Sequence, residues 1–412
     1  MTESSPISII YKDLNKLFDD NPNIDELGLI LSTKDYDSGL ESKPFILIES
    51  NKLGISFQFV SQLYGYCFTI FNQLRSDFDK LVGANPLSLS LFNNHNDLLK
   101  QINDASRNLL LVNAENLSAL NMRKKLIIIG YNNHMNEIKT LNLIFTKHPK
   151  SGEAWCHRRW VLLDYKKKNN NAMLSSEVEL GVCKRVAEIY PKNYYAWTHR
   201  WWVLCNLSVK EKLEDLQIIE DWVKRNISDY CGYHHRFLIL SSLFNHTNNN
   251  NNNNSNNSSA PDNNNNIELQ DIISIYTQEV HFINRLITLY PGHESPWTYK
   301  RLLSNYLLTG IPLNNKSNIS NQIGVNLQSE YEFCETVIAD TDSSYYQQQK
   351  GFAQRYLCKI LDLYTSPNIN DTSLKIDDIN QCYKENITNL IESFPHQTQF
   401  WNYKLSKQTD RK

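Results

Sequence analysis

Residues 191–200 read Pro191-Lys192-Asn193-Tyr194-Tyr195-Ala196-Trp197-Thr198-His199-Arg200. Pro191 predicts the end of one helix, and Asn193 is a residue type that commonly caps the next one. Trp197 and Arg200 are three positions apart, so we expect them on one face of that second helix. Apolar residues at helical spacing predict an amphipathic helix just upstream, at Leu180, Cys183, Val186 and Tyr190. The stretch therefore describes a helix, a short turn and a second helix.

The same arrangement recurs along the chain. In each copy an aromatic or apolar residue, which we call the anchor, is followed three positions later by Arg or Lys. The clear pairs are Trp155 and Arg158, Tyr233 and Arg236, and Trp297 and Lys300. Weaker pairs are Leu120 and Arg123, and Trp401 and Lys404. Starting from the first weak copy, successive anchors are 35, 42, 36 and 64 residues apart. A period near 40 residues is typical of helical-hairpin repeats. The sequence therefore predicts an all-α fold, a right-handed α-α superhelix (solenoid or crescent) of helical hairpins.

One segment interrupts this period. Between Asn248 and Asn266 thirteen of nineteen residues are Asn, which leaves nothing apolar to offset the entropy of ordering the chain. We expect a disordered Asn-rich insertion over residues 247–266, within a repeat solenoid over residues 105–412. Residues 1–104 precede the clear repeats and are expected to form a partly helical leader that packs on the solenoid, with Phe45–Glu49 as a short strand or an extended arm.

The composition agrees with a helical protein. Gly and Pro together number 25 of 412 residues, about half of their usual share, which disfavours a many-stranded sandwich or barrel. The net charge of −2 argues against a nucleic-acid partner bound through the overall field. The chain shows no secretory signal, no apolar run long enough to span a membrane and no paired cysteines. We therefore expect a cytoplasmic protein without a metal site of its own.

The recurring Trp, Tyr and basic side chains are expected to serve packing first. An indole can fill the seam between neighbouring hairpins, and a base one turn later can bond a carbonyl or carboxylate of the adjacent unit. Three histidines occupy one repeat position, His157, His199 and His235. We expect them to hydrogen-bond between repeats rather than to bind a metal.

The string Pro-x-Asn-Tyr-x-x-Trp-x-His-Arg, at this period and over residues 105–405, resembles the α-subunit repeat of protein prenyltransferases. The resemblance implies the α subunit of a heterodimeric protein geranylgeranyltransferase, wrapped around a β subunit of the Rab geranylgeranyltransferase type. It implies that the β subunit holds Zn²⁺, that this chain binds no cofactor itself, and that geranylgeranyl diphosphate is the co-substrate. The acceptors would be proteins with a cysteine in their C-terminal region.

The resemblance also implies which residues act. Lys150 matches the lysine that contacts the diphosphate during catalysis, and the following repeat contributes contacts to the diphosphate and to the β subunit from Lys192, Asn193, Tyr194 and Tyr195. The chain departs from the family pattern at two places. Ser151-Gly152 stands where the family has Asn-Tyr, and Tyr195 stands where it has His, so a hydroxyl donor expected at position 152 is missing.

Two other readings fit the same repeats. A non-catalytic α-solenoid scaffold would bind peptides or proteins in its groove and would be stable as a monomer. The chain could also be the α subunit of a farnesyl or Rab-type enzyme. Purification with and without a β subunit distinguishes the scaffold from the enzyme subunit.

Overall fold

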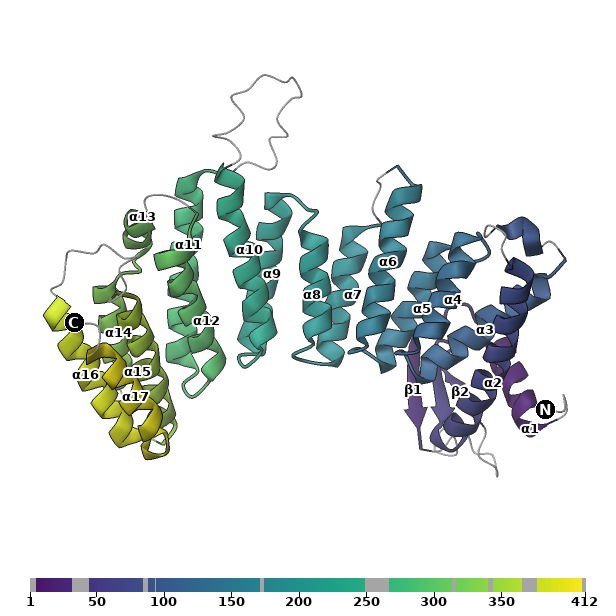
Figure 1. Ribbon diagram of the computed structural model, residues 1–412, viewed down its shortest axis with the longest axis horizontal. Coiled ribbons are helices and arrows are strands. Elements are labelled where there is room, and N and C mark those ends of the chain that lie inside the picture. The colour runs from purple at the N-terminus through teal and green to yellow at the C-terminus, as the bar shows by residue number, and fades with distance from the viewer. Residues whose placement is uncertain are drawn as a thin grey trace, which may run out of the picture. The chain divides into compact units, whose positions relative to one another are not determined.

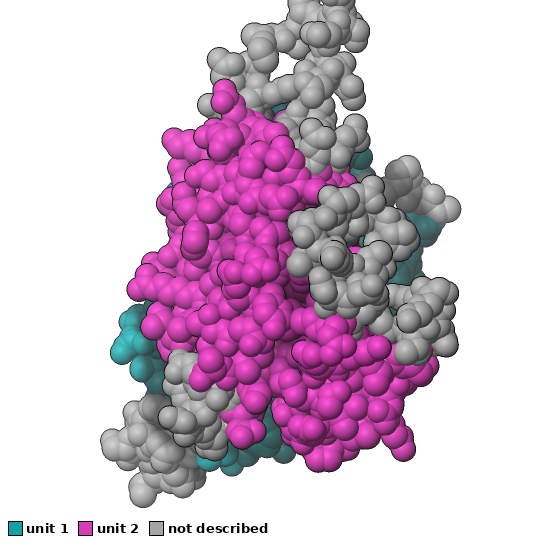
Figure 2. All heavy atoms as spheres, turned by 90° about the vertical axis from the view of Figure 1, so that its left-hand side faces the viewer, with its two compact units in different colours: residues 1–203 teal, residues 204–412 magenta. Residues whose placement is uncertain are grey.

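The computed structural model describes residues 5–31, 44–83, 88–92, 94–170, 174–248, 267–312, 316–339, 344–364 and 376–409. Most of the Asn-rich insertion expected at 247–266 lies outside these ranges, and the helix before it runs to Asn248. The described chain forms two compact units, Met1–Val203 and Leu204–Lys412, which Figure 2 colours separately. We describe each unit by itself.

The first unit is a series of helices joined by short turns (Figure 1). Its helices are α1 (Pro6–Asp20), α2 (Phe57–Val82), α3 (Asn96–Val112), α4 (Leu117–Ile128), α5 (His134–Lys147), α6 (Gly152–Lys168), α7 (Ser176–Ile189) and α8 (Tyr194–Leu204), with a 3-10 turn, η2 (Leu89–Phe92), before α3. Helix α5 packs against α3, α6 and α7, and α4 packs against α6. The boundary between leader and repeats predicted at 104/105 falls inside α3, and the leader's role stays a prediction.

A small sheet precedes α2. Its strands are β1 (Glu26–Ile30), β2 (Phe45–Ile48) and β3 (Lys52–Ser56), in the order β1-β3-β2. Strand β1 pairs with β3 in parallel, and β2 pairs with β3 antiparallel. The backbone N–H of Leu27 donates to Thr146 Oγ1 at 3.0 Å, which ties β1 to the end of α5. The sequence indicated the strand at Phe45–Glu49 but not its partner β3, nor β1 on the other side of β3.

The second unit continues the helical hairpins. Its elements are α9 (Val209–Arg225), α10 (Tyr230–Asn248), α11 (Leu269–Leu289), α12 (Glu294–Asn305), the π-helical turn η4 (Tyr306–Gly310), α13 (Lys316–Ile323), α14 (Leu327–Ala339), α15 (Ser344–Tyr364), α16 (Ile376–Ser393), the 3-10 turn η5 (Pro395–Gln397) and α17 (Thr398–Thr409). Consecutive helices pack as pairs, among them α9 with α10 and α11 with α12. The all-α class of helical-hairpin repeats predicted from the sequence is confirmed.

Buried carboxylates join the two helices of each hairpin. In four hairpins a carboxylate on the first helix contacts a side chain twenty residues later on the second: Glu137 with His157 at 2.8 Å, Glu179 with His199 at 3.0 Å, Asp215 with His235 at 2.9 Å, and Glu279 with Tyr299 at 2.6 Å. Each histidine thus bonds to the first helix of its own hairpin, because the turn folds it back onto that helix. The expected bond between repeats is also present at His199, whose Nδ1 accepts from Arg159 Nε of the preceding hairpin at 3.3 Å.

The bases at the repeat anchors join one hairpin to the next. Each reaches a carboxylate on the first helix of the following hairpin: Arg123 to Glu137 at 2.7 Å, Arg158 to Glu179 at 2.7 Å, Arg236 Nε to Glu279 Oε1 at 2.8 Å, and Lys300 to Glu330 at 2.6 Å. Arg200 and Arg236 also donate to a carbonyl within their own hairpin, that of Leu180 at 3.1 Å and that of Leu216 at 2.6 Å. Glu137, Glu179 and Glu279 are therefore shared between their own hairpin and the preceding one. We call this set, Glu137, Glu179 and Glu279 with their partners, the carboxylate ladder.

Two carboxylates of the ladder, Glu137 and Glu179, are held in the ionised form. Burial alone would raise the pKa of Glu137, but the Arg123 guanidinium and the hydrogen bond with His157 lower it from 4.5 to about 2. Burial opposes ionisation at Glu179 in the same way, and His199 and Arg158 lower its pKa to about 2. Both groups bind protons more weakly in the folded chain than in the unfolded one, which links stability to pH.

We expect the free energy of unfolding to fall as the pH is lowered. Because the folded pKa is below the unfolded one, the stabilisation is complete above the unfolded pKa of 4.5 and is lost as the pH approaches 2. Glu137 and Glu179 each contribute on the order of 3 kcal/mol to this loss. Urea unfolding of the wild type and of Glu137→Gln at several pH values measures it. Equal pH slopes for the two proteins would contradict this account of the ladder.

Candidate functional site

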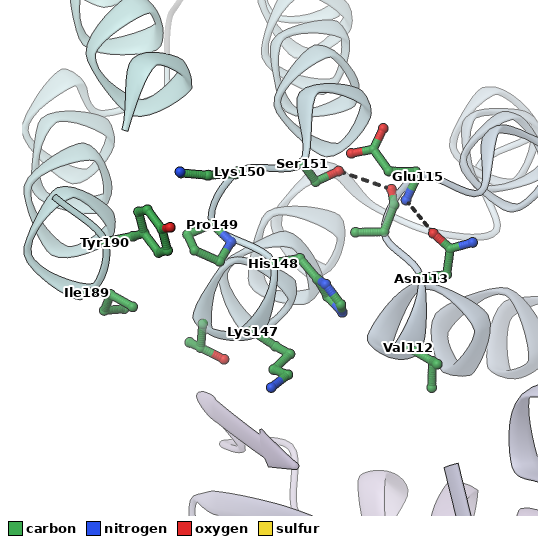
Figure 3. A pocket seen from close by; sticks show the side chains of 12 residues that line it. Val112, Asn113, Glu115, Lys147, His148, Pro149, Lys150, Ser151, Ile189 and Tyr190 are labelled. Atoms are coloured by element: carbon green, nitrogen blue, oxygen red, sulfur yellow. Dashed lines mark hydrogen bonds between the residues drawn. The ribbon is translucent and has the colours of Figure 1, made fainter. Parts of the chain in front are cut away.

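Three successive turns of the first unit enclose a pocket of about 540 Å³. Residues 112–115 run from the end of α3 toward α4, residues 146–151 run from the end of α5 to the start of α6, and residues 189–190 are the last residue of α7 and the one after it. Lys150 is one of the lining residues, and Figure 3 shows its side chain extending toward Tyr190. The structure thus places the predicted catalytic lysine in a pocket formed by turns that belong to different hairpins.

The backbone beside Lys150 is held from both sides. The carbonyl of Pro149 accepts hydrogen bonds from Trp155 Nε1 at 3.1 Å and from Asn193 Nδ2 at 2.7 Å. Ser151 Oγ donates to the carbonyl of Ala114 at 3.2 Å (Figure 3) and caps the N-terminus of α6. The lysine side chain itself is exposed. A fixed turn therefore presents an exposed lysine to solvent.

Tyr190 is the aromatic contact of this lysine. Lys150 Nζ lies 3.8 Å from the centroid of the Tyr190 ring, within the range of a cation–π interaction. The tyrosine is the last residue before the Pro-marked turn, the position that Tyr290 occupies in a later repeat. From its spacing in the sequence, Tyr190 was predicted only as part of the helix before Pro191. Its recurrence before the proline was the signal that could have identified it.

The electrostatics of the pocket suit an anion. Two lysines, Lys147 and Lys150, line it together with a single carboxylate, Glu115, among the described residues. Burial lowers the pKa of His148, although the contact of its Nε2 with the carbonyl of Leu111 at 2.9 Å opposes this effect, so the charged form of this histidine is disfavoured. Ser151, the N-cap of the 17-residue helix α6, also lines the pocket. The N-terminus of this helix therefore lies at the pocket, and helix N-termini attract negative charge.

The second predicted group lies in the next turn and does not line this pocket. Asn193 is fully buried and accepts hydrogen bonds from the backbone N–H groups of Tyr195 and Ala196. Lys192 and Tyr194 are exposed, and Lys192 has a positive φ of 61°. The structure therefore separates a buried capping residue from exposed side chains that can meet a partner or a substrate.

Tyr195 explains the glycine that departs from the family pattern. Its ring lies against Gly152, and a Cβ at position 152 would come within 3.0 Å of Tyr195 Cε1. A larger residue at position 152 would force this ring to move. The differences from the family pattern at positions 152 and 195 thus belong together, because the small Gly152 in one turn leaves room for the large Tyr195 ring in the next.

The predicted repeat anchors are all buried. Their side chains are at most 6% exposed at Trp155, Arg158, Trp197, Arg200, Tyr233, Arg236, Trp297, Lys300 and Trp401. Phe145 stacks on Trp155 with ring centroids 4.1 Å apart, which links α5 to α6. These positions are inaccessible to a substrate, and their contacts are those of packing residues.

We expect Asn193→Ala to destabilise the protein by about 2 kcal/mol. About half of this loss is the helix cap, and the rest is the hydrogen bond to the carbonyl of Pro149. Asn193→Ser keeps a capping oxygen but cannot reach Pro149, so it should lose about 1 kcal/mol. Thermal and urea unfolding measure both changes. If the two variants lost equal stability, the cap would not contribute as described.

The turns, the anchors and the carboxylate ladder define an all-α repeat protein built from helical hairpins. A family model described as the protein prenyltransferase alpha subunit repeat matches residues 134–165, 176–207, 213–243 and 276–307. These ranges coincide with the hairpins α5/α6, α7/α8, α9/α10 and α11/α12.

Curated relatives match most of the chain. The Homo sapiens protein prenyltransferase alpha subunit repeat-containing protein 1 is 30% identical over 323 residues, which cover 71% of this chain and 75% of the relative. The Xenopus laevis protein prenyltransferase alpha subunit repeat-containing protein 1-B is 30% identical over 386 residues, 84% of this chain and 85% of the relative. The chain belongs to the protein prenyltransferase α-subunit repeat family.

A solved structure, Candida albicans protein geranylgeranyltransferase-I complexed with GGPP, is similar at a TM-score of 0.41 and 16% identity, over 76% of this chain and 90% of that chain. A likeness at this level supports no statement about activity. Within the described residues, no group of three or more His, Cys, Asp and Glu side chains could hold a metal ion. No described helix is both long and apolar enough to cross a membrane.

Proposed function

We propose that this chain is the α subunit of a cytoplasmic, heterodimeric protein geranylgeranyltransferase. Its partner would be a β subunit of the Rab geranylgeranyltransferase type, around which the α subunit wraps. The complex would transfer a geranylgeranyl group from its diphosphate to a cysteine thiol in the C-terminal region of an acceptor protein. Membership of the prenyltransferase α-subunit repeat family supports the class, and the pocket at Lys150 supports the role.

The reaction builds negative charge at one place. A bond forms between the acceptor sulfur and C1 of the isoprenoid, the bond between C1 and the diphosphate oxygen breaks, and the thiol gives up its proton. The departing diphosphate carries the charge. A donor that is already in position stabilises this charge without a reorganisation cost at the moment of reaction.

The observation that carries the proposal is the exposed Lys150 on a fixed turn. Hydrogen bonds from two different hairpins hold the carbonyl of Pro149, so the neighbouring lysine has little backbone freedom. Its ammonium group lies beside Tyr190 and near the N-terminus of α6. A lysine, a tyrosine and a helix N-terminus on one rim are suitable donors for a diphosphate.

The next turn has a supporting role in this proposal. Lys192 and the hydroxyl groups of Tyr194 and Tyr195 are exposed donors that can reach the diphosphate or the β subunit. Asn193 is buried and acts by positioning this turn. Zinc, which activates the acceptor thiol as a thiolate, belongs to the β subunit in this proposal.

Co-expression with candidate β subunits tests the proposal. We expect a 1:1 complex that transfers labelled geranylgeranyl to a cysteine-containing acceptor, and no transfer by either chain alone. Farnesyl diphosphate as a competing donor measures the preference for isoprenoid length. A chain that remains a stable monomer, co-purifies with no β subunit and supports no transfer would contradict the proposal. That outcome would favour the peptide-binding scaffold.

A further inference from the structure

A second pocket, of about 260 Å³, lies in the first unit between the end of α1 and the helices α3, α4 and α5. Three cationic side chains line it, Arg107, Arg123 and Lys139, and no carboxylate among the described residues does. We propose that this pocket binds a phosphate group, held by Arg107, Lys139 and the Asn136 amide. It shares no lining residue with the pocket at Lys150.

Arg107 is fixed in place with donor capacity to spare. Its Nη2 donates to Asn15 Oδ1 at 3.0 Å and lies 3.2 Å from Asp104, and its guanidinium stacks on Phe18 at 4.2 Å from the ring centroid. Its buried Nε has no hydrogen-bond partner among the described residues. A buried donor without a partner is costly in free energy, and an anion in the pocket would remove that cost.

Arg123 contributes charge rather than free donors. Its guanidinium is bonded to Glu137, and its Nη1 also reaches Asn103 and Ser106. Desolvation and the charge of Arg123 lower the pKa of Arg107, although Asp104 opposes this effect. The two guanidinium groups therefore repel each other, and the charge of Asp104 does not fully offset the combined effect of this repulsion and of burial on Arg107.

Lys139 adds a further positive charge on the open side. It is exposed, and no ion-pair partner is found for it within the described ranges. The charged groups around the pocket are the cations Arg107, Arg123 and Lys139 and the carboxylates Asp104 and Glu137. Lys100 also lies beside Asp104, but its charge is balanced by its second partner, Asp19. One positive charge remains in excess, which favours an anionic ligand.

The geometry favours phosphate over a carboxylate. Donors approach from α3 and α5, and a phosphate offers more charge and more acceptor oxygens than a carboxylate to donors arranged in this way. Asn136 lies in the first turn of α5, a helix of 14 residues, where the helix dipole adds to the attraction. The volume is below that of pockets for drug-sized ligands, so the ligand is a phosphate with at most a short organic group.

Titration of the full chain with inorganic phosphate, followed by calorimetry and by the 31P linewidth, tests the proposal. We expect saturable binding that Asn136→Asp weakens at least about tenfold, because the new carboxylate repels the anion. An acidic residue suits the first turn of a helix, so this variant should fold. Lys139→Gln, which changes an exposed residue, should weaken binding by about the same factor.

Two controls separate this pocket from other effects. Asn96→Asp makes the same change in the first turn of α3, outside the pocket, and should leave binding unchanged. Lys184→Ala removes an exposed lysine that lines neither pocket and should also leave binding unchanged. Vesicles containing phosphatidic acid distinguish a lipid headgroup from a phosphate in solution. The proposal is overturned if the wild type shows no saturable binding, if acetate binds as tightly, or if Asn136→Asp binds as well as the wild type.

Discussion

Replacing Lys150 by alanine is expected to lower the rate of geranylgeranyl transfer by about 100-fold in the complex with the β subunit, because a positioned donor to a developing anion is worth about that factor. The side chain lies in the pocket, contacts Tyr190 and is exposed. Its removal should therefore affect the departing diphosphate and leave the fold intact. Single-turnover transfer of labelled geranylgeranyl measures the change.

Three comparisons make this result specific. Lys184→Ala removes an exposed lysine from α7 outside the pocket and should change the rate less than about twofold. Lys150→Arg keeps the positive charge and should retain more activity than alanine. Size-exclusion chromatography should show the complex with β at wild-type yield. Unchanged single-turnover chemistry in Lys150→Ala would remove the lysine from the mechanism.

Glu179→Gln is expected to destabilise the protein by about 3–5 kcal/mol, the usual cost of breaking a buried ion pair. The Glu179 carboxylate accepts from Arg158 Nε at 2.8 Å, pairs with Arg158 Nη2 at 2.7 Å and contacts His199 at 3.0 Å. A glutamine has the same size but leaves the fully buried Arg158 without its counter-charge. Urea unfolding measures the loss, which is a large share of the stability of a typical domain.

A matched substitution on the same helix is the control. Glu188 lies on α7 as well but is exposed, so Glu188→Gln should change the stability by less than about 0.5 kcal/mol. Adding Arg158→Met to Glu179→Gln removes the unpaired charge and should restore part of the lost stability. If the exposed and the buried glutamate gave equal effects, the ladder would not be a source of stability.

The helices and the turns between them could be predicted from the sequence, because both depend on residues that are close together along the chain. Apolar spacing predicted the helix that ends before Pro191, and Asn193 caps the next helix as its residue type indicated. The anchors Trp155 and Trp197 were predicted as packing residues from their recurrence, and both are buried. The position of Lys150 in a turn followed from the same pattern, although its catalytic role stays a prediction.

The carboxylate partners of the buried Arg and Lys side chains could not be predicted from local sequence. Glu179 and Glu188 are alike in the sequence, nine residues apart on one helix, and only the packing of α6 and α8 against α7 makes the first a buried counter-charge. The carboxylate partners of His157, His199 and His235 could not be predicted for the same reason. The strand β1 was also missed, because it pairs with β3 across a sequence separation that the local pattern does not encode.

The sequence by itself determined the repeat, its period, its turns and the residues that anchor it, because these depend on local spacing and on turn-forming residue types. The tertiary structure decided which carboxylate meets which base, which turns enclose Lys150 and Tyr190, and where the second cationic pocket lies at Arg107 and Lys139. Those contacts join side chains from different hairpins. Their distances are fixed only when the hairpins pack, since buried charges are stable only where the folded chain brings their partners together.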